Sequence, residues 1–194
     1  MPRPRLAAAL LALAGALAAG ACTGHDAVST DSGSDRFVAG DGIVTYVPAA
    51  RRAAGPALSG TTLDGASLDV TSLRGGVVVL NIWGSWCAPC KAEQPALERV
   101  ARATRSRGVR FVGVDIREPG RTPAQRHVAR FAVSYPSLYD PSARLLTRFD
   151  VVPKATPSTY LLDPAGRIAA YVFGPVEEAA LTELVDRVLA EPSS

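Results

Sequence analysis

Cysteine and histidine are scarce in this chain of 194 residues, which has three cysteines and two histidines. A structural zinc site takes four ligands, usually two CxxC pairs or one such pair with two histidines. Only one CxxC pair is present, and the two histidines, His25 and His127, lie far apart in the sequence. These counts argue against a structural zinc site, and we expect neither a resident metal nor a cofactor.

Lysine is nearly absent, and neither sign of charge is in excess once the N-terminal segment is set aside. The chain has 21 basic and 18 acidic residues, and Arg3 and Arg5 belong to a segment that contains no acid. Residues 22–194 therefore hold 19 basic and 18 acidic residues. A net charge so near zero offers no electrostatic footprint for a polyanion, so we expect no nucleic-acid partner.

The apolar run Leu6–Leu17 is too short to be a comfortable membrane span. It follows the basic stretch Met1–Arg5 and precedes small residues that continue to Ala21. This order of basic, apolar and small residues is typical of a secretory signal. Residues 1–21 are therefore interpreted as a signal peptide, and the alternative is a transmembrane anchor.

Cys22 stands directly after Ala19-Gly20-Ala21, an order that resembles the bacterial lipobox. In a lipobox the cysteine is acylated and becomes the first residue of the mature protein. Pairing of Cys87 with Cys90 would also leave Cys22 as an odd thiol in an exported chain, which requires an explanation. We predict lipid attachment at Cys22, with two or more acyl chains for stable anchoring. An ordinary signal peptide followed by an incidental cysteine is the alternative.

The mature chain divides by composition into two parts. Residues 22–55 are rich in Gly, Ser, Asp, Thr and Ala, with one brief apolar patch at Ile43–Val47, and they are interpreted as a flexible tether. Residues 56–194 are interpreted as one folded domain. Its patterns predict an Asp-Gly hairpin over 62–68, strands over 77–83, 109–115, 158–163 and 168–173, and helices over 88–106, 122–132 and 176–190. This order is typical of an α/β fold with a mixed central sheet.

The segment Trp86-Cys87-Ala88-Pro89-Cys90 lies where a buried strand is expected to give way to a helix. Residues i and i+3 share one helix face, so the two sulfur atoms can approach within bonding distance. The positive end of the helix dipole would favour the thiolate of Cys87, and the thiolate is the attacking species. Cys87 is therefore the predicted nucleophile, and Cys90, one turn deeper, is the predicted resolving thiol.

The cysteine pair has two other interpretations besides redox chemistry. A purely structural disulfide rarely closes so small a loop, because it removes little entropy from the unfolded chain. A copper carrier remains open, since soft thiolates suit Cu(I). Redox chemistry is the favoured interpretation.

The residues around the cysteines resemble a known family. The stretch from Val77 to Pro95, with the segments Tyr135–Asp140 and Thr156–Arg167, is similar to the TlpA/ResA family of exported thioredoxin-like proteins over roughly residues 56–190. The resemblance implies a thioredoxin fold, in which helices flank a central mixed sheet, with an N-terminal hairpin and an inserted helix over 122–132.

The resemblance also implies how protons reach the site. Asn81, six residues before Cys87, replaces the titrating aspartate of classical thioredoxin. Glu93, three residues after Cys90, takes the place of the family's active-site glutamate and would exchange a proton with the Cys90 thiol. The alternative for Glu93 is a solvated helix glutamate.

Contacts with substrate are implied for residues on both sides of the dithiol. Pro157 is the family's cis-proline, which would present the backbone of Thr156 to an extended substrate segment, and the alternative is a trans proline that starts a strand. Trp86 is interpreted as a contact surface for partners rather than a core aromatic. Trp83 is assigned to the core and His127 to the surface of the inserted helix.

The sequence therefore predicts a lipid-anchored thiol–disulfide oxidoreductase that reduces disulfides in other proteins on the extracytoplasmic face of the cell membrane. Its expected substrates are disulfide-containing exported proteins, with a membrane thiol reductase as electron donor and apocytochrome c as one substrate that the resemblance suggests. The alternatives are an oxidase that donates disulfides and a copper chaperone that uses Cys87 and Cys90.

Overall fold

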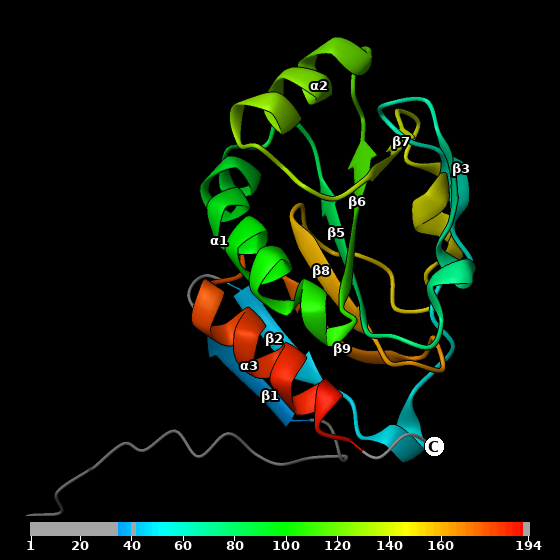
Figure 1. Ribbon diagram of the computed structural model, residues 1–194, viewed down its shortest axis with the longest axis vertical. Helices are drawn as coiled ribbons and strands as arrows, with labels where there is room; N and C mark the ends of the chain where they lie inside the picture. Colours follow the sequence, from blue (N-terminus) through cyan, green and yellow to red (C-terminus); the bar gives the residue numbers. More distant parts are fainter. Residues whose placement is uncertain (1–34, 40–41, 192–194) are drawn as a thin grey trace, which may run out of the picture.

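The computed structural model describes residues 35–39 and 42–191. The predicted signal peptide and Cys22 lie outside these residues. Seven strands form one mixed sheet in the order β1-β2-β9-β8-β5-β6-β7 (Figure 1). The strands β5, β6 and β7 are parallel, whereas β5, β8, β9, β2 and β1 pair antiparallel. Their bounds are β1 Asp35–Ala39, β2 Gly42–Tyr46, β5 Val78–Trp83, β6 Arg110–Ile116, β7 Ser137–Asp140, β8 Ser158–Leu162 and β9 Ile168–Phe173.

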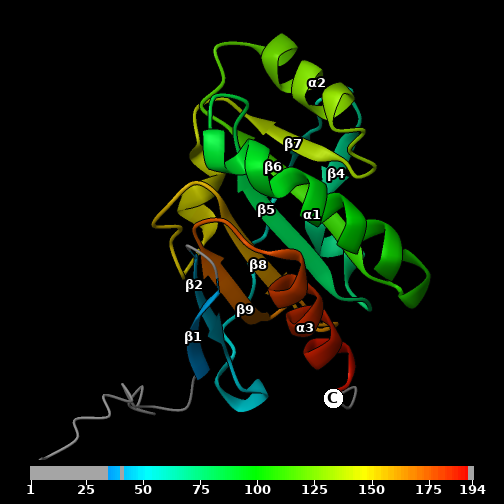
Figure 2. The same ribbon diagram turned by 90° about the vertical axis from the view of Figure 1, so that its left-hand side faces the viewer.

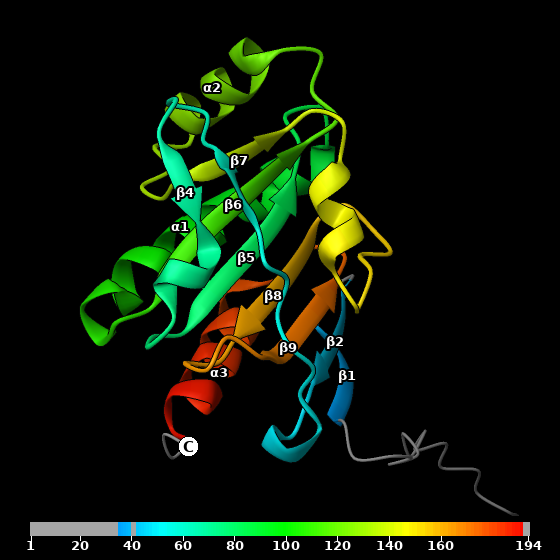
Figure 3. The same ribbon diagram turned by 90° about the vertical axis from the view of Figure 1, so that its right-hand side faces the viewer.

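Helices cover one face of this sheet, and a hairpin covers the other. The helices α1 (Ala88–Thr104) and α3 (Glu178–Leu189) pack side by side on one face (Figure 2). The small sheet of β3 (Ser59–Thr61) and β4 (Ser67–Asp69) lies over the opposite face (Figure 3). The helix α2 (Arg121–Arg130) stands at the end of the molecule toward which β5 and β6 run. Short 3₁₀ helices occupy Ala49–Arg51, Val70–Leu73, Arg105–Arg107 and Arg144–Arg148.

The central strand β5 is buried on both faces, as its continuous apolar run predicts. Alternate residues point to opposite faces of a strand, so Val79 joins the core beneath α1 and α3 while Val78 and Leu80 join the core beneath the hairpin. The strand therefore ends in a rigid position at Trp83. The cysteine motif begins three residues later.

The expected tether over 22–55 extends too far into the chain. The strands β1 and β2 and the 3₁₀ helix Ala49–Arg51 all fall within it, and β2 pairs with β9 from Ile43 to Tyr46. The apolar patch at Ile43–Val47 is thus a strand whose partner lies far away in the sequence. The composition of a short segment cannot reveal that the segment pairs with a strand so far away in the sequence. Among the residues described, no helix is long and apolar enough to cross a membrane.

Candidate active site

The two cysteines lie at the N-terminus of α1, directly beyond the end of β5. Cys87 is the N-cap residue, and its Sγ accepts a hydrogen bond from the Cys90 N–H at 3.1 Å. The two residues form a disulfide with their Cα atoms 5.3 Å apart. Pro89 falls in the first turn, where the backbone N–H would have no partner within the helix. The local sequence therefore presents the pair at the positive end of the helix dipole.

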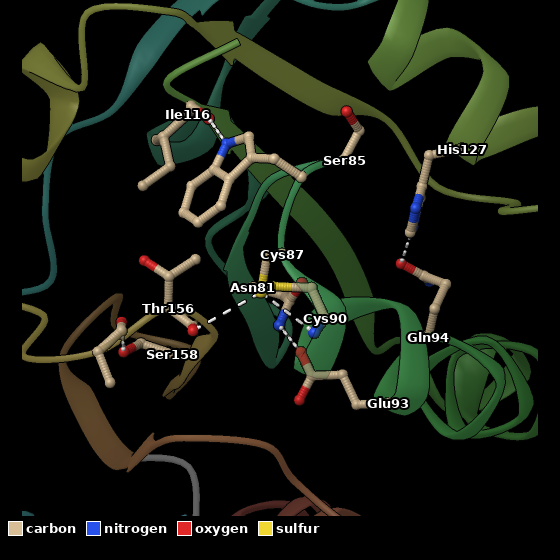
Figure 4. Close-up of a disulfide and its surroundings, with 12 residues drawn as sticks. Asn81, Ser85, Cys87, Cys90, Glu93, Gln94, Ile116, His127, Thr156 and Ser158 are labelled. Carbon is tan, nitrogen blue, oxygen red and sulfur yellow. Dashed lines mark hydrogen bonds between the residues drawn. A yellow bond between two sulfur atoms is a disulfide. The ribbon is translucent and has the colours of Figure 1, made fainter.

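The loop before β8 faces this disulfide. The Thr156 carbonyl oxygen lies 3.6 Å from the Cys87 Sγ (Figure 4). The Thr156-Pro157 bond is cis, which confirms the predicted conformation. Pro157 is buried and Thr156 is half-buried, so the carbonyl of Thr156 is the part of this loop that meets the sulfur.

Glu93 lies on α1, one helical turn beyond Cys90, and it is buried with 4% of its surface exposed. Its Oε1 accepts a hydrogen bond from Asn81 Nδ2 and its Oε2 accepts one from the Val176 N–H, each at 2.9 Å. Burial raises the pKa of Glu93 to about 7, although both hydrogen bonds act to lower it. The alternative of a solvated glutamate is therefore wrong, because this carboxyl group is buried and hydrogen-bonded inside the molecule.

A cavity of about 390 Å³ connects Glu93 to the surface between α1 and the loop before α3. Its walls include Ala92, Ala96, Pro175 and Val176. Small side chains on α1 leave this space open beside Glu93.

Trp86 stands beside the nucleophile with 48% of its surface exposed, whereas Trp83 is 2% exposed and belongs to the core, as expected. The Trp86 Nε1–H donates to the Ile116 carbonyl oxygen at 3.1 Å. The indole lies so close to Gly84 that a Cβ there would collide with its nitrogen. The ring is thus held at one edge while one face remains open to a partner.

A buried acidic pair behind this turn has no counterpart in the sequence interpretation. Both carboxylate oxygens of Glu118 accept hydrogen bonds from Ser85, one from its backbone N–H and one from its hydroxyl group at 3.0 Å. Asp115 is fully buried, and its carboxyl group lies against that of Glu118. Burial, together with the negative charge of Glu118, raises the pKa of Asp115 to about 8. The sequence feature that could have revealed this pair is Asp115, a charged residue in the otherwise apolar strand that is predicted over 109–115.

The expectation that His127 is a surface residue is wrong. The side chain is 5% exposed, and its ring stacks on Trp83 with 4.5 Å between centroids. His127 Nε2 lies 3.2 Å from Gln94 Oε1, and burial lowers the pKa of the imidazole to about 4. The inserted helix α2 packs back onto Trp83, so one of its faces is buried although its sequence is strongly polar.

A cysteine pair capping a helix beyond a central strand, opposite a cis-proline loop, defines a thiol–disulfide oxidoreductase of the thioredoxin fold. Residues 52–171 match the AhpC/TSA family, and the chain belongs to that family. The chain is similar to the thiol–disulfide oxidoreductase ResA of Bacillus subtilis, with 29% identity over 64% of this chain and 68% of the relative. The ResA of Halalkalibacterium halodurans is 30% identical over 66% of this chain and 72% of that protein.

Solved structures agree with this assignment. A secreted thiol–disulfide isomerase from Corynebacterium glutamicum superposes with a TM-score of 0.73 at 28% identity, covering 82% of this chain and all of that one. A DsbF homologue from Corynebacterium diphtheriae gives a TM-score of 0.71 at 29% identity, covering 80% of this chain and 99% of the other. The chain is therefore an enzyme that exchanges thiols and disulfides with other proteins.

Proposed function

We propose that this enzyme is a lipid-anchored reductase of disulfides in exported proteins. The observation that carries the proposal is the Cys87–Cys90 pair at the N-terminus of α1, with Glu93 buried one turn below and the Thr156 carbonyl opposite. An extracytoplasmic location agrees with solved relatives described as secreted.

The reaction begins with the reduced pair. The Cys87 thiolate attacks one sulfur of a substrate disulfide, forms a mixed disulfide and expels the other substrate sulfur as a thiolate. Cys90, once deprotonated, attacks the Cys87 sulfur and releases the second substrate thiolate. The substrate gains two electrons, and the enzyme keeps the Cys87–Cys90 disulfide.

Glu93 is proposed as the group that moves the Cys90 proton. As a carboxylate it accepts the proton when Cys90 becomes the nucleophile, and as a carboxylic acid it returns a proton when the pair is reduced. A pKa of about 7 allows both states near neutral pH. The cavity beside Ala92 and Ala96 provides the route to solvent.

Substrate contact is assigned to the exposed face of Trp86 and the backbone of Thr156. An extended substrate segment can add to the loop before β8, as a strand adds to a sheet edge. The implied substrates are exported proteins that contain disulfides, with apocytochrome c proposed from the resemblance. Each cycle needs two electrons from a dithiol donor, for which we propose a membrane thiol reductase.

An equilibrium redox titration of the pair tests the direction of electron flow. A potential of about −270 mV supports the reductase, and one of about −120 mV would instead support a disulfide-donating oxidase. Titration of the reduced protein with Cu(I) tests the copper-carrier alternative. Tight binding that depends on both cysteines, together with no turnover of disulfides, would favour the carrier.

The lipid anchor is tested separately at Cys22. Replacement Cys22→Ser should move the protein from the membrane fraction to the soluble fraction and remove the acyl mass from the mature chain. A wild-type chain without lipid mass would contradict the anchor and leave the redox assignment intact.

A further inference from the structure

Arginine side chains gather at the end of the molecule opposite the dithiol. A cavity of about 530 Å³ opens there between the loop that precedes β5 and the loop that precedes β6. Arginines stand on both sides of it, and glycines form much of its floor. We name it the basic pocket. Its lining includes Arg74, Gly75, Gly76, Arg107, Gly108 and Arg110, together with apolar residues of α3 and Glu191.

The floor of the basic pocket depends on glycine. Gly75 and Gly108 adopt positive φ angles of 96° and 84°, which side chains rarely allow. A Cβ on Gly76 would lie 2.6 Å from the Gly108 carbonyl oxygen, so the two loops can meet only without side chains. Their close approach at the floor places the arginines around an open space.

The charges around the basic pocket do not cancel. Arg107 pairs with Asp186 at 2.6 Å, and the Glu191 carboxylate at the rim is held by Arg52. Within the described part of the chain, Arg74 and Arg110 have no carboxylate within 4.0 Å. Both are exposed. The charge of Arg74 is partly compensated, because it acts on the nearby Asp69 carboxylate, and the charge of Arg110 adds to the positive side of the balance. The near-neutral total charge of the chain therefore conceals a local excess.

The sheet register places the N-terminal end of β1 at this same end of the molecule. Asp35 pairs with Tyr46, and the ladder continues through β9 and β8 to Val79, near the start of β5. At the other end of β5, Trp83 leads into the cysteine motif. Twelve residues separate Cys22 from Asp35, and such a chain spans at most about 45 Å. A lipid on Cys22 would hold the basic pocket near the membrane.

We infer that the basic pocket binds the phosphate of anionic lipid headgroups at the membrane surface. Arginine donates hydrogen bonds to phosphate in a matching planar geometry, and anionic lipids attract basic residues that come within a Debye length. Docking through this pocket turns the dithiol away from the membrane, toward exported substrates. The orientation rests on the proposed lipid anchor, whereas the phosphate site does not.

The experiment uses the exported chain carrying Cys22→Ser, so that no acyl chain contributes to binding. Sedimentation is measured with vesicles of phosphatidylcholine alone and with vesicles in which about one lipid in three is phosphatidylglycerol. Binding is expected only to the anionic vesicles and is expected to weaken with added salt. Replacing Arg74 and Arg110 by glutamine should lower the affinity about 25-fold, which corresponds to about 2 kcal/mol.

A matched control removes two exposed arginines outside the pocket, Arg126→Gln with Arg144→Gln, and should change the affinity less than about twofold. The proposal would be overturned if both double variants lost the same affinity for anionic vesicles, or if the wild-type pocket bound both kinds of vesicle equally. Binding of inorganic phosphate that depends on Arg74 and Arg110, together with no binding to anionic vesicles, would overturn the lipid assignment in favour of a free anion. Turnover of a small disulfide should be unchanged in all variants, which separates failure of this site from failure of the redox function.

Discussion

Two buried carboxyl groups flank the cysteine motif, and their surroundings give them different properties. Glu93 accepts two hydrogen bonds and reaches solvent through a cavity, so it can exchange its proton. Burial and the neighbouring Glu118 raise the pKa of Asp115 to about 8, which keeps this carboxyl group largely neutral at pH 7. A neutral Asp115 leaves Glu118 free to accept hydrogen bonds from Ser85. Glu93 is therefore the carboxyl group that we propose for proton transfer. Asp115 instead supports Glu118, which holds the Ser85 turn.

Replacing Glu93 by glutamine should remove the proton acceptor of the resolving step. The wild-type rate of disulfide reduction should rise with pH through about 7, as the carboxylate forms, and the variant should lack this inflection. At pH 7.5 its kcat should be lower by about 100-fold. Glu183→Gln, an exposed position on α3, is the matched control. Superimposable pH–rate profiles for wild type and Glu93→Gln would refute the assignment.

The same group should also leave a signature in stability. The folded-state pKa of Glu93 is raised from 4.5 to about 7, so the folded protein binds more protons than the unfolded chain between these values. Wild-type stability should therefore fall as pH rises from about 4.5 to 7, by at most on the order of 3 kcal/mol. Denaturant titrations of Glu93→Gln over this range should show no such decline.

The two sulfur atoms should behave differently when each is removed. Cys90→Ala leaves the nucleophile but no resolving thiol, so mixed disulfides with exported proteins should accumulate. Cys87→Ala should trap little, because Cys90 lies inside the first turn of α1 whereas Cys87 is the N-cap residue that faces the Thr156 loop. Gels run without reductant after thiol blocking measure the difference. Equal trapping by both variants would contradict the assignment of the nucleophile.

At the scale of elements, the loop after β6 holds the turn that precedes the nucleophile. Glu118 accepts both hydrogen bonds of Ser85, and the Ile116 carbonyl accepts from the Trp86 indole. These bonds join the ends of two neighbouring parallel strands. The position of Trp86 beside Cys87 is thus determined by β6 as much as by β5.

Glu118→Ala should loosen this turn without removing the chemistry. The Ser85 N–H loses its buried acceptor, which costs about 1–3 kcal/mol of stability. Because the indole is then less well positioned, KM for a protein substrate should rise while kcat for a small disulfide stays near wild type. Glu118→Gln retains one acceptor oxygen and should restore most of the KM. A parallel loss of both activities in Glu118→Ala would show a general structural defect instead.

The elements differ in how far the sequence predicts them. β5, α1, β9 and α3 were predicted within two residues or so, because each has its own apolar period or run and a clear boundary. The prediction missed β1, β2 and β7, which are short, and β2 finds its partner β9 more than a hundred residues away. Pairing at such a distance leaves no trace in local composition.

The residues of the active site also divide into those that the sequence predicts and those that it does not. Cys87, Cys90, Glu93 and the cis Thr156-Pro157 bond could be predicted from a contiguous motif and a family resemblance. The Glu118–Ser85 contact and the burial of His127 could not, because both depend on how a loop and the inserted helix pack onto distant strands. Residues brought together by tertiary packing lack a spacing that sequence can reveal.

At the scale of the whole molecule, a buried ionic network ties both ends of the described chain to the sheet. Arg52, with 1% of its side chain exposed, donates to Asp163 in the β8–β9 turn at 3.1 Å and to Glu191 after α3 at 2.5 and 2.6 Å. Tyr46 of β2 donates to Glu191 and receives a hydrogen bond from Arg52. The network joins β2, the β8–β9 turn and the segment after α3, all at the end that carries the basic pocket.

Replacing Arg52 by methionine should destabilise the protein strongly, because it leaves Glu191 without its main partner while preserving side-chain volume. Removing one member of a buried ion pair costs about 3–5 kcal/mol, whereas removing both is far milder, so Arg52→Met with Glu191→Gln should recover much of the loss.

The same network should make stability depend on pH. Burial acts to raise the pKa of Asp163, but hydrogen bonds from Arg167 and Arg52 lower it below its usual value. Burial likewise acts to raise the pKa of Glu191, but hydrogen bonds from Arg52 and Tyr46 lower it below its usual value. Groups with lowered pKa values stabilise the fold above their unfolded pKa and lose that contribution as pH falls. Wild-type stability should therefore decline below about pH 4, and the single variant should decline less steeply. Denaturant titrations across this range measure both effects, and a single variant as stable as wild type at pH 7 would show that the network does not hold the two chain ends.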